Sequence, residues 1–343
     1  MKIIFFLSTP TPYFLDSIQR LNDVFSPGKL LVVYDPLHHY TGYSTLLKKY
    51  NYESIHINDL QKYGGLSSFL RRFNPDLIYI PGWINKRLFL TTMWSKYEFV
   101  LGMDTPYLGK LRQKIFVKLI FAIAGRKKIR KIWTAGTAKS MKYARMINPG
   151  ARVLPGLYCA TVEKFIKNGV KTEMHDPIRL LYCGRLSPEK NPQLLIEALK
   201  GTEGFELWVA GSGPMLPIIN AQGFVRYTGN VSPDELPDIM KEVDFLVLPS
   251  IYDRWGVVVH EAASAGLPLL LSYEVGAREW FLLPNKNGFL FSPYHTRELI
   301  SILKMIRHLD NEKFREMSLI SKKLGTLYNQ YMWAMNFASF LHN

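Results

Sequence analysis

The sequence predicts an α/β protein built of two doubly wound domains, each around a parallel sheet. The chain has 343 residues, which is more than one hydrophobic core usually organises. Short apolar runs alternate with longer segments of helical pattern, as they do in βαβ units. Hydrophobic residues make up 48% of the chain and charged residues 21%. This composition supplies enough apolar side chains for two cores.

Short apolar runs mark the predicted strands. Those of the first domain are Lys2–Leu7, Leu30–Tyr34, Leu77–Ile80 and Phe99–Leu101. Those of the second are Ile178–Cys183, Glu206–Ala210, Val225–Thr228, Phe245–Leu248 and Leu269–Leu271. Helical patterns between strands of the second domain cover Pro192–Leu199, Asp234–Lys241 and Val257–Ala265. We therefore expect a first domain at 1–163 and a second at 178–330, joined by the polar segment 164–177 as a linker, with a terminal helix in 331–343.

The net charge of +15 is unevenly distributed. Residues 1–160 contain 24 Lys and Arg against 8 Asp and Glu, whereas 161–343 contain 19 and 20. The first half should therefore meet an anionic partner: a membrane surface, a phosphorylated acceptor or nucleic acid. Lys110–Lys131 alone holds nine Lys and Arg and no acid. It predicts a basic amphipathic helix followed by the cluster Arg126–Lys131, either a membrane-binding element or an ordinary solvated helix face. Nucleic acid is not expected, because no aromatic-interleaved basic stripe accompanies it.

Two cations follow directly from a predicted strand of the second domain. Arg185 and Lys190 come after Ile178–Cys183, and Pro192 suits the first turn of the next helix. Side chains at the carboxyl end of a parallel strand point to where α/β proteins bind ligands. An arginine fork and a mobile lysine charge both suit phosphate. The alternative is a pair of solvated surface cations.

A second segment combines a helix start with two acids. Trp255-Gly256-Val257 opens a predicted helix that carries Glu261, and Asp253 precedes it. Free amides at a helix start favour a diphosphate, and carboxylates accept bonds from sugar hydroxyls. Asp253 as a helix cap and Glu261 as a salt-bridged helix residue are the alternatives.

Two further segments are weaker signals. Gly211-Ser212-Gly213 resembles the start of a dinucleotide fingerprint but lacks the third glycine, since position 216 is Leu. It predicts a tight loop beside a nucleotide rather than a dehydrogenase. Asp104 follows a predicted strand and is a candidate for receiving an acceptor's proton, or else a cap of the basic helix. No metal-ligand spacing is found, and the two cysteines, Cys159 and Cys183, fit a reducing compartment.

Together these segments resemble the retaining glycosyltransferases of family 4, also called glycosyl transferases group 1. The resemblance extends from about Ile178 to Pro293 and includes Glu279 after Val275-Gly276. It implies the GT-B fold, two Rossmann-like domains facing across a cleft, with the terminal helix crossing back to the first domain. It also implies that the donor is a nucleoside-diphosphate sugar, UDP- or GDP-linked, and that no metal or other cofactor is needed.

The resemblance assigns roles to particular residues. Arg185 and Lys190 would hold the diphosphate, Glu261 the ribose and Asp253 the donor sugar, with Glu279 nearby. Asp253 stands where the family's first motif glutamate would be, one methylene shorter. The expected function is hexose transfer with retention to a saccharide or lipid-linked acceptor, in bacterial surface polysaccharide or lipopolysaccharide synthesis. The expected location is cytoplasmic, on the inner face of the membrane. A sugar-nucleotide epimerase or hydrolase, or a non-catalytic membrane- or nucleic-acid-binding protein, are the alternatives.

Overall fold

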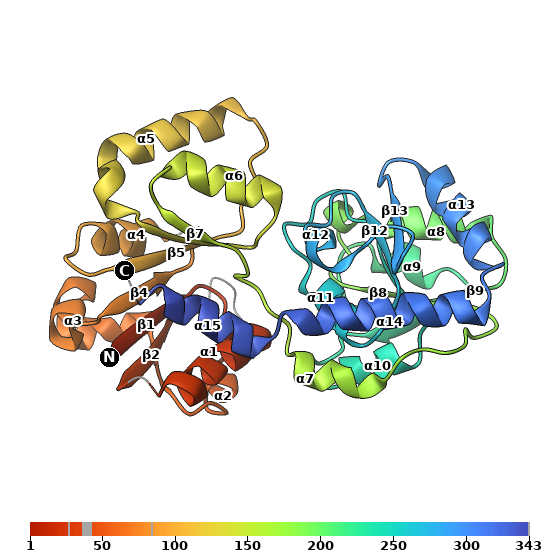
Figure 1. Ribbon diagram of the computed structural model, residues 1–343, viewed down its shortest axis with the longest axis horizontal. Helices are drawn as coiled ribbons and strands as arrows, with labels where there is room; N and C mark the ends of the chain where they lie inside the picture. Colours follow the sequence, from red (N-terminus) through yellow and green to blue (C-terminus); the bar gives the residue numbers. More distant parts are fainter. Residues whose placement is uncertain (27, 36–42, 84, 342–343) are drawn as a thin grey trace. The chain divides into compact units, whose positions relative to one another are not determined.

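The computed structural model describes residues 1–26, 28–35, 43–83 and 85–341, without the side chains of 43–44 and 121–127. The chain divides into two compact units (Figure 1). The first unit is Met1–Cys159 together with Gln330–Asn343, and the second is Ala160–Asn329. Each unit contains one parallel sheet, so the predicted α/β class with two Rossmann-like domains is confirmed.

The sheet of the first unit has seven parallel strands in the order β3-β2-β1-β4-β5-β6-β7. The strands are β1 Lys2–Leu7, β2 Lys29–Tyr34, β3 Glu53–His56, β4 Leu77–Ile80, β5 Phe99–Met103, β6 Lys131–Thr134 and β7 Arg152–Leu154. The sequence prediction missed β3, β6 and β7. Two of them are edge strands and are only partly buried, so they lack the continuous apolar run of a central parallel strand.

Helices cover this sheet. They are α1 Pro12–Phe25, α2 Tyr43–Leu47, α3 Leu66–Phe73, α4 Lys86–Met93, α5 Leu111–Lys128, α6 Ala138–Ile147 and α15 Gln330–Ser339, with the 3-10 turn η1 Ile57–Tyr63. The terminal helix α15 packs beside α1 (Figure 1). Its fully buried Trp333 lies 4.7 Å from the Trp133 ring and 6.3 Å from that of Phe5. These aromatic contacts make the end of the chain part of the first core.

The sheet of the second unit has six parallel strands in the order β10-β9-β8-β11-β12-β13. They are β8 Ile178–Cys183, β9 Phe205–Ala210, β10 Val225–Gly229, β11 Phe245–Leu248, β12 Leu269–Ser272 and β13 Gly288–Phe291. Its helices are α7 Val162–Phe165, α8 Pro192–Lys200, α9 Leu216–Asn220, α10 Leu236–Lys241, α11 Val257–Ser264, α12 Arg278–Phe281, α13 Thr296–Ile306 and α14 Asn311–Leu327, with the turns η2 Ile166–Asn168 and η3 Pro188–Lys190. The strand order reverses beside β8 and β11, where doubly wound sheets bind ligands.

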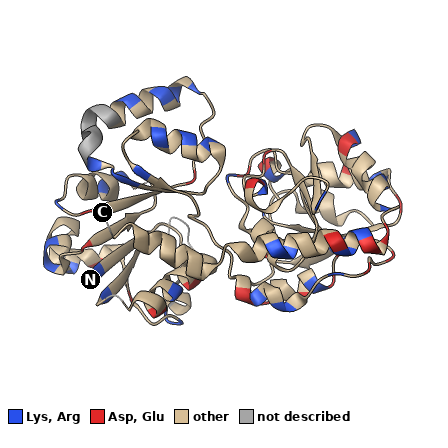
Figure 2. Ribbon diagram, in the orientation of Figure 1, with Lys and Arg blue, Asp and Glu red and all other residues tan. Residues whose placement is uncertain are grey.

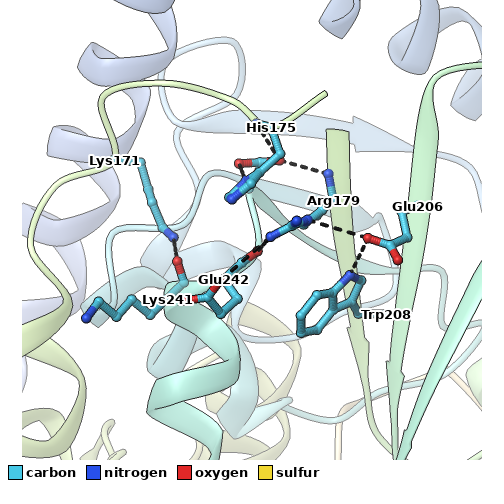
Figure 3. Close-up of polar contacts among 8 residues, drawn as sticks. Lys171, His175, Arg179, Glu206, Trp208, Lys241 and Glu242 are labelled. Carbon is cyan, nitrogen blue, oxygen red and sulfur yellow. Dashed lines mark hydrogen bonds and ion pairs between the residues drawn. The ribbon is translucent and has the colours of Figure 1, made fainter. Parts of the chain in front are cut away.

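The segment 164–177, expected to be a linker, is part of the second unit. Asp244, the residue before β11, is fully buried. His175 Nδ1 lies 2.9 Å from its Oδ1, and the backbone N–H groups of His175 and Arg179 donate to its Oδ2 at 3.2 and 2.8 Å (Figure 3). The segment was expected to be a linker because it is polar. Its polar groups instead form hydrogen bonds with a buried carboxylate, which is costly to leave without partners.

The basic region of the first unit differs from the sequence prediction in two ways. Lys131 lies in β6, is buried, and pairs with Glu98 at 3.2 Å, as does Arg130 at 2.9 Å. The side chains of Arg126 and Lys127 lie outside the described residues. In addition, α5 has apolar side chains on two faces: Phe116, Val117 and Ile120 pack on the core, whereas Leu111, Ile115 and Leu119 are exposed. In the part of the chain that the structure describes, no helix is both long and apolar enough to cross a bilayer.

Candidate functional site

The loop after β8 carries Arg185 and is fixed by close backbone contact with the loop after β9. Gly184 N–H donates to Ala210 O at 2.9 Å, and Leu186 N–H to Ser212 O at 2.8 Å. A Cβ on Gly211 would lie 2.0 Å from Gly184 O, and one on Gly213 would lie 2.3 Å from Leu186 O. Glycine is therefore required at both positions, because any side chain would force the two loops apart.

Arg185 and Lys190 occupy different environments on this loop. The Arg185 side chain is 73% exposed and pairs with Glu189 at 3.2 Å. Lys190 is 19% exposed, and its Nζ lies 2.6 Å from Asp253 Oδ2. Lys190 is thus anchored, whereas Arg185 is free to turn toward a ligand. Both stand at the carboxyl end of β8, the position predicted for ligand binding.

The backbone around Lys190 joins the loop after β8 to the loop after β11. Glu189 O accepts hydrogen bonds from the N–H groups of Ile251 and Tyr252 at 2.9 and 3.3 Å. Asn191 adopts a left-handed conformation with φ of 54° and donates its side-chain amide to Pro293 O at 2.9 Å. Both residues belong to the sequence motif that carries the family resemblance, but sequence reasoning gave neither of them a role. An Asn directly before a proline-started helix indicates a position where a left-handed residue is tolerated.

Asp253 is held on both sides by backbone. It forms an isolated parallel bridge with Val275. Its N–H donates to Glu274 O at 3.2 Å, and its carbonyl accepts from Gly276 N–H at 3.0 Å. These bonds place the exposed Glu279, in the first turn of α12, on the segment that adjoins the Asp253 loop. The carboxylate also accepts from Trp255 N–H at 3.3 Å through Oδ1. The main partner of the Asp253 carboxylate is Lys190. Asp253 therefore belongs with Arg185 and Lys190 and is not the cap of α11.

The helix α11 begins at Val257, immediately after Gly256, whose φ of 85° favours glycine. In the described chain no side chain caps this helix start, which leaves its amides available to an anion. Trp255 is buried against Trp280 and Phe281, with ring centroids 5.6 and 6.2 Å away. Trp255 therefore supports the turn rather than facing solvent.

Glu261 lies on the second turn of α11, partly buried. Burial raises the pKa of its carboxyl to about 7, and the Lys164 ammonium offsets part of that rise. Lys164 itself pairs with Asp234 at 2.7 Å, so it acts on Glu261 from a distance and the salt-bridged alternative is not supported. Burial, together with the nearby Glu261 carboxylate, raises the pKa of the Cys183 thiol to about 12. Glu261 thus faces the carboxyl end of β8.

His260, next to Glu261, is a structural residue. Its Nδ1 accepts a hydrogen bond from Ala160 N–H at 3.0 Å, so the proton lies on Nε2, which is 2.9 Å from Gly325 O. The ring stacks on Phe281 at 4.2 Å, and burial lowers its pKa to about 4. The neutral imidazole ties the start of the second unit to α11 and α14.

Asp104 lies in the first unit, just after β5. Tyr158 donates its hydroxyl to Asp104 Oδ2 at 3.1 Å. Burial raises the pKa of Tyr158 far above its usual range, and the Asp104 carboxylate raises it further, so this proton stays on the phenol. Because α5 begins at Leu111 with Lys110 at its cap position, Asp104 is not the cap of that helix. The structure therefore groups Arg185, Lys190, Asp253, Gly256 and Glu261 in the second unit, whereas Asp104 belongs to the first.

Comparison with known proteins addresses this second unit. Residues 164–318 match the family model described as glycosyl transferases group 1. All the candidate residues of the second unit lie within this matched segment, as do the two glycines that fix its first loop.

Relatives and solved structures extend the comparison. An alpha-D-kanosaminyltransferase of Streptomyces kanamyceticus is 28% identical over 148 residues, which cover 40% of this chain and 38% of that protein. The chain spans about two fifths of the length of the first curated relatives it matches. Anabaena Alr3699/HepE in complex with UDP-glucose has a TM-score of 0.75 at 16% identity, and the lipopolysaccharide outer core galactosyltransferase WaaB has 0.70 at 17%, each covering 99% of both chains. These structures share the GT-B fold of the chain.

Proposed function

We propose that the protein is a glycosyltransferase that moves a hexose from a nucleoside-diphosphate sugar to a saccharide or lipid-linked acceptor, with retention of anomeric configuration. The observation that carries this proposal is the pairing of Lys190 with Asp253 at 2.6 Å, beside the uncapped start of α11, within the segment that matches the group 1 family model. Fixed positive charge, helix amides and a carboxylate that bonds sugar hydroxyls are what binding such a donor requires.

Each residue has a part in the transfer. Lys190 and the exposed Arg185 hold the diphosphate, with the amides at Val257, and stabilise the charge that develops as the bond to the anomeric carbon breaks. Glu261 accepts hydrogen bonds from the ribose. Asp253 orients the donor sugar and holds Lys190 in place. Preorganised charges of this kind each lower an activation barrier by about 3 kcal/mol. These cations and amides take the role that a metal has in other transferases, so we propose that no metal or other cofactor is used.

We further propose that the acceptor binds the first unit, where Asp104 takes or orients the proton of its hydroxyl. The group is suited to this role because the hydrogen bond that Tyr158 donates to its Oδ2 orients the carboxylate. A role in bacterial surface polysaccharide or lipopolysaccharide synthesis is supported by the fold shared with WaaB, a lipopolysaccharide galactosyltransferase. The donor base is proposed to be uridine or guanosine; UDP-glucose is bound by Alr3699/HepE.

The helix α5 supports a cytoplasmic location, peripheral on the inner face of the membrane. Leu111, Ile115 and Leu119 form an aliphatic row, and they are 72%, 56% and 54% exposed. The exposed Lys110, Lys114 and Lys118 form a cationic row beside it at the same spacing. Neither α5 nor α6 contains an acidic residue, and both carry Lys and Arg (Figure 2). Such a surface suits an anionic lipid bilayer, where each cation contributes about 1 kcal/mol.

A panel of sugar nucleotides tests the transferase proposal. The protein, a candidate acceptor and each donor are incubated, and donor consumption and glycosylated acceptor are both measured. Consumption that depends on acceptor supports transfer. Consumption without acceptor would instead indicate a hydrolase or epimerase, and no consumption of any donor would overturn the proposal.

Vesicle flotation tests the membrane proposal. The protein should bind phosphatidylglycerol vesicles at low salt, release as salt rises, and ignore neutral vesicles. Changing Leu111, Ile115 and Leu119 to Ser should abolish this binding, whereas changing Leu327, which is 72% exposed in the second unit, to Ser should not. Equal binding by both variants would refute the assignment to α5.

A further inference from the structure

A hollow between α3 and α4 is separate from every residue discussed above. It has a volume of about 600 Å³ and lies between two helices that pack side by side (Figure 1). The segment that closes it, Trp94–Tyr97, joins the end of α4 to the start of β5. The hollow is therefore at the amino ends of the strands, whereas Asp104 follows the carboxyl end of β5.

The wall of this hollow is apolar and exposed. Trp94 is 62% exposed and Leu90, one helical turn earlier, is 44% exposed. Leaving an indole and an isobutyl group in water forgoes the free energy of burying them. Their position around a concave surface, rather than singly on a convex one, is typical of a binding site.

The rim of the hollow is polar and basic. Arg71 and Lys96 are exposed at the rim, and Ser67 and Thr91 supply hydroxyl groups. Arg71 donates one bond to Ser68 Oγ at 3.0 Å, which leaves other donors of its guanidinium for a ligand. None of the described residues that line the hollow is acidic. The rim therefore favours an anion with several hydroxyl groups.

We propose that this hollow binds an acidic saccharide, one whose sugar rings carry carboxylate or phosphate groups. A sugar ring has an apolar C–H face that lies on an indole, and its hydroxyls bond to the serine, threonine and guanidinium groups around it. Arg71 forms paired hydrogen bonds with a carboxylate or phosphate. A lipid surface fits less well, because the apolar side chains line a concavity of limited size rather than protruding. Binding here requires no nucleotide, so the proposal does not depend on the donor chemistry of the second unit.

Isothermal titration of the full chain tests this proposal. The probes are a galacturonic acid hexasaccharide, maltohexaose as its neutral counterpart, and phosphatidylglycerol vesicles. Wild-type protein should bind the acidic hexasaccharide more tightly than maltohexaose, without nucleotide. Trp94→Ala should weaken that binding about tenfold, the scale of one aromatic contact. Arg71→Gln should reduce the preference for the acidic probe.

Matched variants in the second unit serve as controls. Tyr294→Ala removes an aromatic ring that is 65% exposed, and Arg315→Gln removes an exposed cation; neither should alter binding of the hexasaccharide. Failure of wild-type protein to bind it, or unchanged binding by Trp94→Ala, would overturn the proposal. So would loss of vesicle binding in Trp94→Ala without any saccharide binding, which would assign the surface to lipid.

Discussion

Replacing Glu261 by Gln should make the stability of the protein less dependent on pH. Burial raises the pKa of Glu261 from 4.5 to about 7. The native state therefore binds a proton more tightly than the unfolded chain between these two values. A carboxyl with a raised native pKa contributes its full stability below pH 4.5, and that contribution is lost as pH rises through 7. Above pH 7 the native state holds an unfavourable buried charge.

The size of this effect follows from the shift itself. At 1.36 kcal/mol for each pKa unit, a rise from 4.5 to about 7 amounts to at most about 3 kcal/mol. Glu261→Gln is always neutral, so it should have little effect on the free energy of unfolding at pH 4.5 and should raise it by up to that amount at pH 8. The readout is the difference between the two pH values, because any packing change contributes equally to both.

Denaturant unfolding at pH 4.5, 6, 7 and 8 measures this difference. Glu173→Gln is the matched control for removing one carboxylate from the same unit, since Glu173 is exposed. A free-energy difference between wild type and Glu261→Gln that is the same at pH 4.5 and pH 8 would refute the reasoning that Glu261 is desolvated.

Further predictions concern the donor site. Arg185→Ala should cut turnover about a hundredfold, the cost of one preorganised charge-stabilising group; kcat/KM equal to wild type would refute its role. Asp253→Asn should lower turnover of the sugar nucleotide but leave affinity for the free nucleoside diphosphate unchanged or higher, because Lys190 loses its counter-charge. Calorimetry with the sugar nucleotide and with the free nucleotide measures the two affinities, and equal losses of affinity for the two ligands would refute the role of Asp253. Excess EDTA should leave initial rates unchanged, and activity restored only by a divalent cation would contradict the cofactor-free mechanism.

The second unit was more predictable from sequence than the first. Its central strands are buried on both faces and read as continuous apolar runs, as Phe245–Leu248 does, and turn residues mark their ends. Predicted and observed bounds of α8, α10 and α11 differ by no more than two residues. The edge strand β3 and the short β7 are half solvated, so their apolar signal is weak.

Charge pattern alone misled the prediction where tertiary contacts use the charge. Lys131 belonged to a basic cluster in the sequence but is a strand residue paired with Glu98. His175 belonged to a polar linker but bonds the buried Asp244. In both cases the interaction partner is tens of residues distant along the chain. A pattern read from neighbouring residues contains no information about such a distant partner. The roles of Arg185, Asp253, Glu261 and the other site residues stay predictions, now with a geometry that experiments can address.

The central claim is that Lys190, which pairs with Asp253, holds a nucleoside diphosphate. Isothermal titration of UDP and GDP into wild-type protein and into Lys190→Gln tests it most directly. A matched variant, Lys200→Gln, removes an exposed cation from the end of α8 in the same unit. We predict that wild type and Lys200→Gln bind one of the two nucleotides with equal affinity and that Lys190→Gln binds it at least tenfold more weakly. Binding of neither nucleotide by wild type, or equal binding by all three proteins, would contradict the account.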